Sequence, residues 1–398
     1  MKRHVDTTDH LQAVLRELDG RRDPMLAEIE RLVMVNSFTD NVPGGRRTGE
    51  MLAEQIAPIQ SLWARRVESE SGRFAPHWLF GTPGTETSAE GAVVIVGHLD
   101  TVFPPGSFEG FHFDGAIARG PGVLDMKGGL VLAIEALRAL DRAGELAKRK
   151  VMLAIVSDEE VGSPEGRPLL QRELRGAACA LVLEAGRKGD AIITSRKGTA
   201  GVTAKAYGKA AHAGNAHREG ANAIWALARF VDLAQNLTDY ERGVTLNVGK
   251  FTGGHGKNTV PDEAEALLDF RFVTTKDGES MMEALHVAAD GACAAVPGTR
   301  IELTGGIART PLERTEASVA LYREYALCAK ECGLGVEEAS LVGGGSDASS
   351  TSAIGIPSID GLGPRGTGFH TREELIDASS LVPKAEALAR FLMGRQPS

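Results

Sequence analysis

The stretch VIVGHLDTV, residues 94–102, joins an apolar run directly to two titratable side chains, His98 and Asp100. The apolar part, residues 92–97, has the length and continuous pattern of a strand that is buried on both faces. His98 and Asp100 stand two residues apart, so on an extended segment their side chains project to the same side. The stretch therefore predicts a buried strand that carries a polar pair at its carboxyl end.

Other predicted strands and helices alternate around this one. Apolar runs at 151–157 and 180–184 predict two more strands, and a helical pattern at 128–143 precedes the first of them. Continuous apolar strands separated by helices indicate a parallel sheet that is covered on both faces. The remaining predicted elements of this style are two helices within 9–37, a helix at 46–57, a helix at 315–332, strands at 338–342 and 355–360, and a helix at 380–394.

The middle of the chain follows a different order. Its apolar periodicity predicts strand, helix, strand, strand, helix and strand at 199–207, 219–237, 244–251, 264–273, 279–290 and 299–304. That order forms a two-layer α+β sandwich. Because 398 residues exceed the chain length that one hydrophobic core usually supports, we expect two domains. The predicted boundaries give an α/β domain at 1–196 and 309–398, with an inserted domain at 197–308.

The composition favours a protein that acts on small molecules. The 44 basic and 53 acidic residues give a net charge of −9, and no basic block offsets it, which argues against nucleic-acid or membrane-surface partners. The four cysteines show no repeated spacing and are expected to be reduced thiols. No apolar run approaches the roughly 18 residues of a membrane span, and the opening residues lack the apolar stretch of a signal peptide. A cytoplasmic protein is expected.

Polar residues gather at the carboxyl ends of the predicted strands, where ligand sites of open α/β sheets lie. Asp158, Glu159 and Glu160 end the strand at 151–157, and Glu184 ends the next. Asp125 in RGPGVLDMKGG and His370 in GPRGTGFHTREE lie in glycine-rich loops. Carboxylates that converge on one crevice repel one another unless a cation neutralises them. Two imidazoles and three carboxylates, one of them shared, suffice for two zinc ions.

Each of these residues has a simpler explanation when it is taken alone. A histidine that follows a strand is more often a hydrogen-bonded loop residue, and the acids at 158–160 would suit the positive end of a helix. Their joint placement at successive strand ends, with imidazole and carboxylate mixed, favours a metal cluster.

The blocks GHLDTV, RGPGVLDMKGG, SDEEVGS, LEAG, GKAAHAG and GFHTREE, in this order, resemble the M20 family of zinc peptidases and amidohydrolases. The resemblance is strongest to its glutamate carboxypeptidase branch, the carboxypeptidase G2-like enzymes. It implies a di-zinc catalytic domain with an inserted dimerisation or lid domain. It also implies that His98 and Glu184 bind one Zn²⁺, that Glu160 and His370 bind the other, and that Asp125 bridges both. Co²⁺ is expected to substitute.

The same resemblance implies roles for three further residues around the metals. Asp100 would orient His98, and Glu159 would be the general base. His212, in GKAAHAG, would donate a hydrogen bond to the oxyanion of the partner subunit's site, so a homodimer through the inserted domain is expected. The alternative for His212 is a capping role on a tight turn.

Substrate contacts are also implied. Asn258 in GKNTVPDEA and Arg271 in LLDFRF match positions that grip a substrate carboxylate, for which arginine is suited. Arg271 could instead be a sheet-surface residue. Gly344, in the glycine run 343–345, would lie beside the substrate, with Asp347 as a helix cap or a loop anchor. Arg196 and Lys197 could hold an acidic side chain or be solvated charges.

The expected reaction is hydrolysis of the amide bond of a C-terminal or N-acylated amino acid by a metal-activated water, most simply with release of glutamate or a similar amino acid. In the family that the sequence resembles, Glu at the ligand position of Glu184 is typical of carboxypeptidase-like or deacylase-like members. The residue after it is alanine in LEAG, where proline is more usual. The second hypothesis is an N-acyl-amino-acid deacylase of the acetylornithine deacetylase or succinyl-diaminopimelate desuccinylase type. A catalytically silent binding protein of the same fold is the third, but it should have lost ligands or the base.

Overall fold

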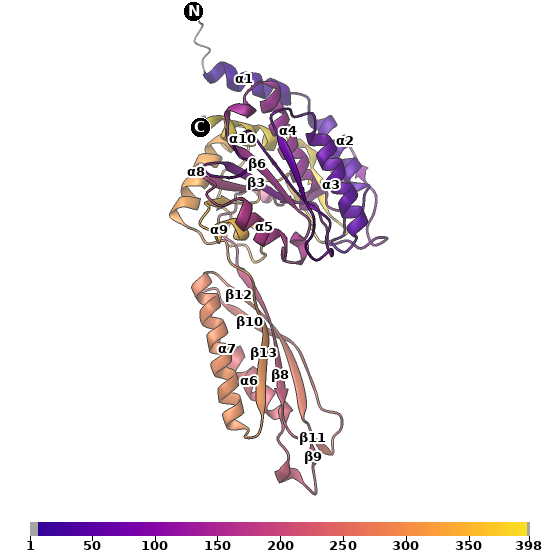
Figure 1. Cartoon of the computed structure of the whole chain (residues 1–398), viewed down its shortest axis with the longest axis vertical. Coiled ribbons are helices and arrows are strands. Elements are labelled where there is room, and N and C mark those ends of the chain that lie inside the picture. Colours follow the sequence, from indigo (N-terminus) through magenta and orange to yellow (C-terminus); the bar gives the residue numbers. More distant parts are fainter. Residues whose placement is uncertain (1–6, 396–398) are drawn as a thin grey trace, which may run out of the picture. The chain divides into compact units, whose positions relative to one another are not determined.

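The computed structural model describes residues 7–395, which divide into two compact units (Figure 1). The larger unit holds the residues up to Ser195, Arg314–Leu341 and the residues from Ser346 onward. The smaller unit holds Arg196–Glu313 and Val342–Gly345. The chain of the smaller unit is thus inserted into that of the larger one.

The larger unit is built on a six-stranded sheet in the order β1-β2-β6-β3-β7-β14. The four strands from β6 to β14 are parallel, whereas β2 runs antiparallel to β6, and β1 antiparallel to β2. Every residue of β3 and β6 is buried, so both faces of the sheet centre are covered. The strands are β1 (Trp63–Val67), β2 (His77–Gly81), β3 (Val93–His98), β6 (Val151–Val156), β7 (Cys179–Val182) and β14 (Ser358–Ile359).

Helices flank this sheet. The apolar helix α4 (Gly128–Arg142) packs against α10 (Leu381–Gly394), and α1 (Thr7–Leu18) contacts both. The side chains of these helices share one buried core with alternate residues of the strands, such as Val93 and Ile95. The other helices of the larger unit are α2 (Arg22–Val33), α3 (Val42–Ile56), α5 (Gly166–Glu173), α8 (Glu316–Glu331) and α9 (Asp347–Ser352).

A second, antiparallel sheet of the larger unit has the order β15-β16-β5-β4. Its strands are short: β4 (His112–Phe113), β5 (Ile117–Arg119), β15 (Gly366–Thr367) and β16 (Leu375–Asp377). The loop from β15 to β16 carries His370. The pairing of β16 with β5 ties this loop to the chain segment that leads to Asp125.

The smaller unit is a two-layer sandwich. Its antiparallel sheet, in the order β10-β12-β8-β13, packs one face against two helices around a core of alternating strand residues (Figure 1). Residues on the other face are more exposed, which is usual for an antiparallel sheet covered on one side. The elements are β8 (Gly198–Tyr207), α6 (Ala223–Gln235), β10 (Thr245–Gly253), β12 (Glu263–Phe272), α7 (Thr275–Ala295) and β13 (Arg300–Arg309). A ribbon of β9 (Ala211–His212) and β11 (Thr259–Val260) extends it.

The structure differs from the sequence prediction in several segments of the larger unit's chain. Residues 338–342 form isolated bridges, Glu338 with Ile192 and Val342 with Arg196, and no strand. The segment Val342–Gly345 groups with the smaller unit, because Arg196 also donates from Nη1 to the Gly344 carbonyl at 3.1 Å. The antiparallel strands β1 and β2 and the four short strands of the second sheet were not predicted.

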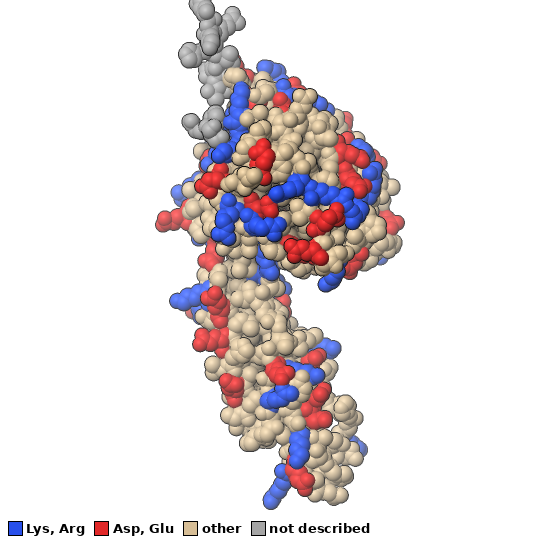
Figure 2. Space-filling model, in the orientation of Figure 1, with Lys and Arg blue, Asp and Glu red and all other residues tan. Residues whose placement is uncertain are grey.

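No helix within residues 7–395 is long and apolar enough to cross a membrane. On the face shown in Figure 2, basic and acidic side chains are interspersed over both units. The four cysteines, all within the described residues, are free thiols.

Candidate metal centre

Asp125 lies between two histidines of the larger unit. Its Oδ1 is 3.1 Å from Nε2 of His98, and its Oδ2 is 3.3 Å from Nε2 of His370. The two imidazoles therefore approach different oxygens of one carboxylate, which is the arrangement that a bridging ligand requires.

A further carboxylate accompanies each histidine. Glu184 Oε1 is 3.7 Å from Nε2 of His98, and Glu160 Oε2 is 3.1 Å from Nε2 of His370. Two ligand atoms that share one tetrahedral zinc ion at about 2.1 Å stand about 3.4 Å apart. The observed spacings and the mixture of imidazole and carboxylate fit such a site, and potential ligand atoms of His98, Asp125 and Glu160 all lie within 4.8 Å of one another.

The fold explains how these residues meet. His98 ends β3, Glu159 and Glu160 follow β6, and Glu184 follows β7, and these three strands are parallel neighbours in the sheet. Asp125 lies in the turn Val123–Lys127, where its backbone is not helical. Asp158, which the sequence placed beside this group, instead accepts the N–H groups at the start of α5.

The tautomer of His98 is defined by the backbone carbonyl of Asp100. Nδ1 lies 3.0 Å from the carbonyl oxygen of Asp100, and because a carbonyl can only accept, Nδ1 carries the proton. In the neutral imidazole, Nε2 then directs its lone pair toward Asp125 and Glu184. A metal-binding histidine needs this tautomer.

The Asp100 carboxylate contacts more than His98. Its Oδ1 lies 3.4 Å from Nδ1 of His98 and accepts the N–H of Glu159 at 3.1 Å, while Oδ2 accepts the N–H of Glu160 at 3.2 Å. Thr39 also donates to Oδ2, at 2.8 Å. One buried carboxylate thus fixes the turn that carries Glu159 and Glu160 relative to His98.

Burial and neighbouring charges shift the pKa values of the imidazoles and carboxylates in the cluster. Burial disfavours charge on His98, yet Asp100 and Asp125 outweigh it and hold the pKa of His98 well above its ordinary value. Burial would raise the pKa of Asp125, but the imidazoles of His370 and His98 hold it below its usual range. Burial and the nearby Asp125 charge raise the pKa of Glu184. A multivalent cation would let the carboxylates ionise while the imidazoles stay neutral.

Glu374 belongs to this site and was not predicted. Its buried carboxylate accepts the backbone N–H groups of Gly122, Leu124 and Asp125 at 2.9 to 3.0 Å. Burial raises the pKa of Glu374 to about 7, although the three N–H donors oppose the shift. Glu374 follows His370 by four residues, so it joins the His370 loop to the turn of Asp125.

His212 lies in the ribbon of the smaller unit and is exposed. Its Nδ1 accepts the backbone N–H groups of Gly214 and Asn215, each at 3.1 Å. Nε2 of the neutral ring therefore carries the proton and can donate a hydrogen bond outward. His212 can therefore contact its own turn through Nδ1 and donate a hydrogen bond to another group through Nε2.

Asn258 and Arg271 do not lie together within one chain, although the sequence analysis treated them as a pair that binds one substrate carboxylate. The carbonyl of Asn258 accepts the N–H of Ala213 at 2.9 Å, which places Asn258 beside His212. Arg271 lies eight residues beyond Glu263, the first residue of β12, which is about 26 Å for an extended strand. Figure 1 shows the β9–β11 ribbon at one end of this unit. The long β12 strand separates the two residues.

The other predicted contact residues have defined surroundings. Both Nε and Nη2 of Arg271 bind Asp269 at 2.8 Å, so that carboxylate orients the guanidinium. Lys197 donates to the Gly243 carbonyl at 2.6 Å, and Arg196 to that of Gly344, so both cations have donors engaged within the smaller unit.

Asp347 does not cap its helix, because the Ser346 hydroxyl accepts the N–H of Ala348 in that role. Asp347 instead accepts the hydroxyl of Ser163, in the loop that follows Glu160, at 2.7 Å. The helix cap, which the sequence pattern favoured for Asp347, is therefore wrong, and Asp347 anchors the loop of Ser163 instead.

Fold and site together define a metallohydrolase with an inserted α+β unit. The chain belongs to the peptidase family M20/M25/M40, whose model matches residues 94–394. It is 30% identical over 307 residues to carboxypeptidase G2 of Pseudomonas sp. (strain RS-16), covering 76% of this chain and 73% of that protein. It is 25% identical to succinyl-diaminopimelate desuccinylase of Acidovorax ebreus, covering 93% and 97% of the two chains.

Solved structures share the fold. An aminopeptidase PepT from Bacillus cereus matches with a TM-score of 0.77 at 22% identity, covering 94% of this chain and 98% of that one. An M20 family metallo-carboxypeptidase from Sulfolobus solfataricus matches with a TM-score of 0.70 at 19% identity, covering 93% and 98%. The chain is thus a peptidase-like hydrolase of this family.

Proposed function

We propose that this hydrolase cleaves the amide bond of a C-terminal or N-acylated amino acid and releases glutamate or a similar amino acid. The observation that carries the proposal is the position of Asp125 between His98 and His370, with Glu184 and Glu160 completing the two halves. This donor set suits two Zn²⁺ ions per chain, which would supply Lewis-acid charge and a water of lowered pKa.

Glu159 is the proposed general base. It is buried, and one of its carboxylate oxygens lies within 4.8 Å of potential ligand atoms of His98 and Glu184. The Asp100 carboxylate holds its backbone N–H, which fixes the position from which its side chain extends. Glu159 takes the proton of the attacking water and later gives it to the departing amine.

His212 is proposed to donate from Nε2 to the developing oxyanion of a second chain's site. Its tautomer supports a donor, and the neighbouring Asn258 would enter the same partner site. Arg271, held by Asp269, would bind the substrate carboxylate from another position along the sheet, and Gly344 would lie beside the substrate.

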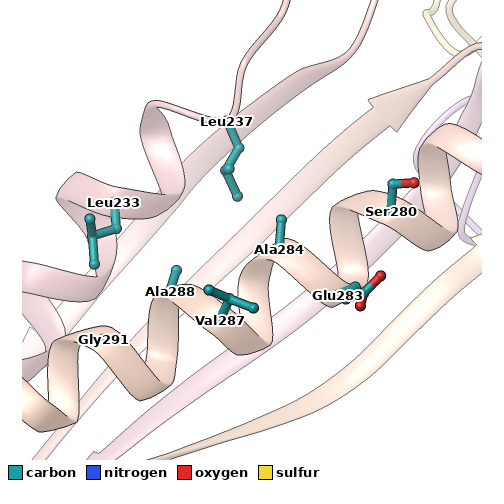
Figure 3. Close-up of a pocket in the computed structure, with 8 residues that line it drawn as sticks. All are labelled: Leu233, Leu237, Ser280, Glu283, Ala284, Val287, Ala288 and Gly291. Atoms are coloured by element: carbon teal, nitrogen blue, oxygen red, sulfur yellow. The ribbon is translucent and has the colours of Figure 1, made fainter.

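A second copy of the chain is the proposed partner of the smaller unit. Helices α6 and α7 border an apolar groove with a cavity of about 570 Å³ (Figure 3). Leu233 and Val287 line it and are 39% and 67% exposed. Exposed apolar surface of this kind is typical of protein–protein contacts.

N-acyl-amino-acid deacylation is the second candidate. The similarity to a succinyl-diaminopimelate desuccinylase along 93% of this chain favours it. The same ligands and the same base would serve both reactions, since only the part of the amide substrate that is recognised differs.

The test is a substrate screen with the zinc-supplemented full chain. Pteroyl-glutamate, dipeptides with C-terminal glutamate, and N-acetyl and N-succinyl amino acids would be compared by the release of the free amino acid. Cleavage of pteroyl-glutamate or the dipeptides supports the carboxypeptidase proposal, whereas cleavage of simple N-acyl compounds alone favours the deacylase. No release from any of them by zinc-loaded protein would contradict both.

A further inference from the structure

Arg365 lies at the base of the hairpin that carries His370. It directly precedes β15, and Asp377 is the last residue of β16, so the two residues face each other across the hairpin. The N–H of Asp377 donates to the Arg365 carbonyl at 2.8 Å, and Nη1 of Arg365 donates to Oδ2 of Asp377 at 2.9 Å. This residue pair thus closes the hairpin through both its backbone and its side chains.

The rest of the Arg365 guanidinium binds Asp190, on the segment that leaves β7. Its Nε donates to Oδ1 of Asp190 at 3.2 Å and its Nη2 to Oδ2 at 2.6 Å, which makes a paired contact. Asp190 is buried, and Nζ of the buried Lys384 lies 3.6 Å from its Oδ1. Burial would raise the pKa of Asp190, but Arg365 and Lys384 hold it below its usual range. Asp190 is therefore a buried carboxylate with two cationic partners.

This ion pair joins the two chain segments that carry Glu184 and His370. Asp190 follows Glu184 by six residues, and Arg365 precedes His370 by five. The backbones of the two segments pair at one point as well, where Gly186 forms a parallel bridge with Arg365. Arg365 therefore ties the hairpin of one proposed ligand to the segment that follows the other.

The two ligands depend on this tie to different degrees. Glu184 directly follows Leu183, whose N–H donates to the Val96 carbonyl of the central strand β3 at 3.2 Å, so the sheet itself holds Glu184 in place. His370 lies in a loop, its side chain is 48% exposed, and its backbone has a φ of 62°. A residue with a Cβ adopts this left-handed conformation only where its surroundings impose it. The loop of His370 therefore depends on contacts such as that of Arg365.

We propose that Arg365 is a positioning residue for one half of the proposed zinc centre, the half that Glu160 and His370 form. Without its guanidinium the hairpin loses its link to Asp190, so His370 no longer keeps a fixed distance from Glu160. The other half, whose ligands His98 and Glu184 follow strands of the sheet, keeps its geometry. This inference rests on the proposed function, because it concerns the same centre, and it adds that the two ions depend on different parts of the fold.

The test is a zinc titration of the chelator-treated full chain carrying Arg365→Gln, in competition with a chromophoric chelator. Contacts that orient ligands typically change metal affinity by about 10- to 100-fold, and we expect a loss of this size for one of the two ions. The other ion should bind as in the wild type. Arg365→Lys should restore only part of the loss, because an ammonium cannot make the paired contact. Asp190 keeps Lys384 as a cationic partner in both variants.

Two ligand variants identify which ion is affected. In His98→Ala only the half of Glu160 and His370 stays complete, and there Arg365→Gln should lower the zinc affinity by the same factor. In His370→Ala only the His98 half stays complete, and there Arg365→Gln should have no effect. Equal losses in both backgrounds would show that Arg365 supports the fold in general and would overturn the inference. Unchanged affinity for both ions in Arg365→Gln alone would overturn it as well.

Arg395→Gln is the matched control. The side chain of Arg395 is 32% exposed against 36% for Arg365, and it also donates to a carboxylate, that of Glu324 at 2.8 Å, but it follows α10, outside the segments that carry the proposed ligands. Both zinc affinities should stay unchanged in this variant. If Arg365→Gln fails to fold, Asp377→Asn removes the charge of a more exposed partner of Arg365 and should show a smaller loss for the same ion alone.

Zinc binding separates this inference from the proposed function. An ion whose affinity depends on Arg365, in a wild-type chain that releases no amino acid from any of the amide substrates, would contradict the proposed function alone. Turnover of those substrates by the wild type, with both zinc affinities independent of Arg365, would contradict the inference alone.

Discussion

Oε1 of Glu374 accepts the backbone N–H of Asp125 at 3.0 Å. The same carboxylate binds the N–H groups of Gly122 and Leu124, so it fixes the turn that presents Asp125 between His98 and His370. The bridging position of Asp125 therefore depends on a residue that is not one of the proposed ligands.

Glu374→Ala should weaken metal binding without removing any proposed ligand. Outer contacts that orient ligands typically change metal affinity by about 10- to 100-fold. Zinc affinity would be measured by competition with a chromophoric chelator, with Glu373→Ala, an exposed neighbour, as the control. Equal affinities in the two variants would show that Asp125 holds its position without Glu374.

Glu159 and Glu160 are neighbours with different proposed roles, so the same change should act differently at each. Glu159→Gln should lower kcat by at least 100- to 10,000-fold, the usual range for general acid–base catalysis, with metal content near that of the wild type. Glu160→Gln should lose metal, because it removes the partner of His370. Elemental analysis of both variants tests this, and a similar loss of metal in both would reject the assignment.

The proposed dimeric site predicts complementation between inactive chains. His212→Ala and Glu159→Gln should each be nearly inactive, but their mixture should regain activity after subunit exchange, since one site of each heterodimer keeps both groups. Asn258→Ala should behave like His212→Ala, because the ribbon places the two residues together. His212→Ala mixed with Asn258→Ala should stay inactive. Heterodimers, verified by differential tags, that remain inactive in the first mixture would exclude action across chains.

Much of the fold followed from apolar patterning. The predicted helices and most strands of both units appear within a few residues of their expected bounds, because their apolar periodicity matches their burial. Strand β1 was missed because it lies at the sheet edge and carries charged, exposed residues such as Arg65 and Arg66, so no alternation marks it. The segment 338–342 is apolar enough for a strand but finds only single bridging partners.

The sequence predicted the site in two ways: apolar patterning indicated the residues that follow strands, and the resemblance to the M20 family implied the loop residues Asp125 and His370. His98, Glu160 and Glu184 follow strands, so their convergence could be predicted. Glu374 lies in the run TREEL beside an exposed glutamate, and no local pattern distinguishes the buried acid from its neighbour. The choice of zinc, the homodimer and the cytoplasmic location stay predictions.

The most direct test of the metal centre is a zinc titration of chelator-treated protein, with bound metal counted by elemental analysis and amide hydrolysis followed at each step. The account predicts no measurable hydrolysis by the metal-free chain, restoration by Zn²⁺ or Co²⁺, and saturation at two ions per chain. Asp125→Asn, which retains the size of the bridging side chain, should lose both metal and activity. Full hydrolysis by protein shown to be free of metal would contradict the account.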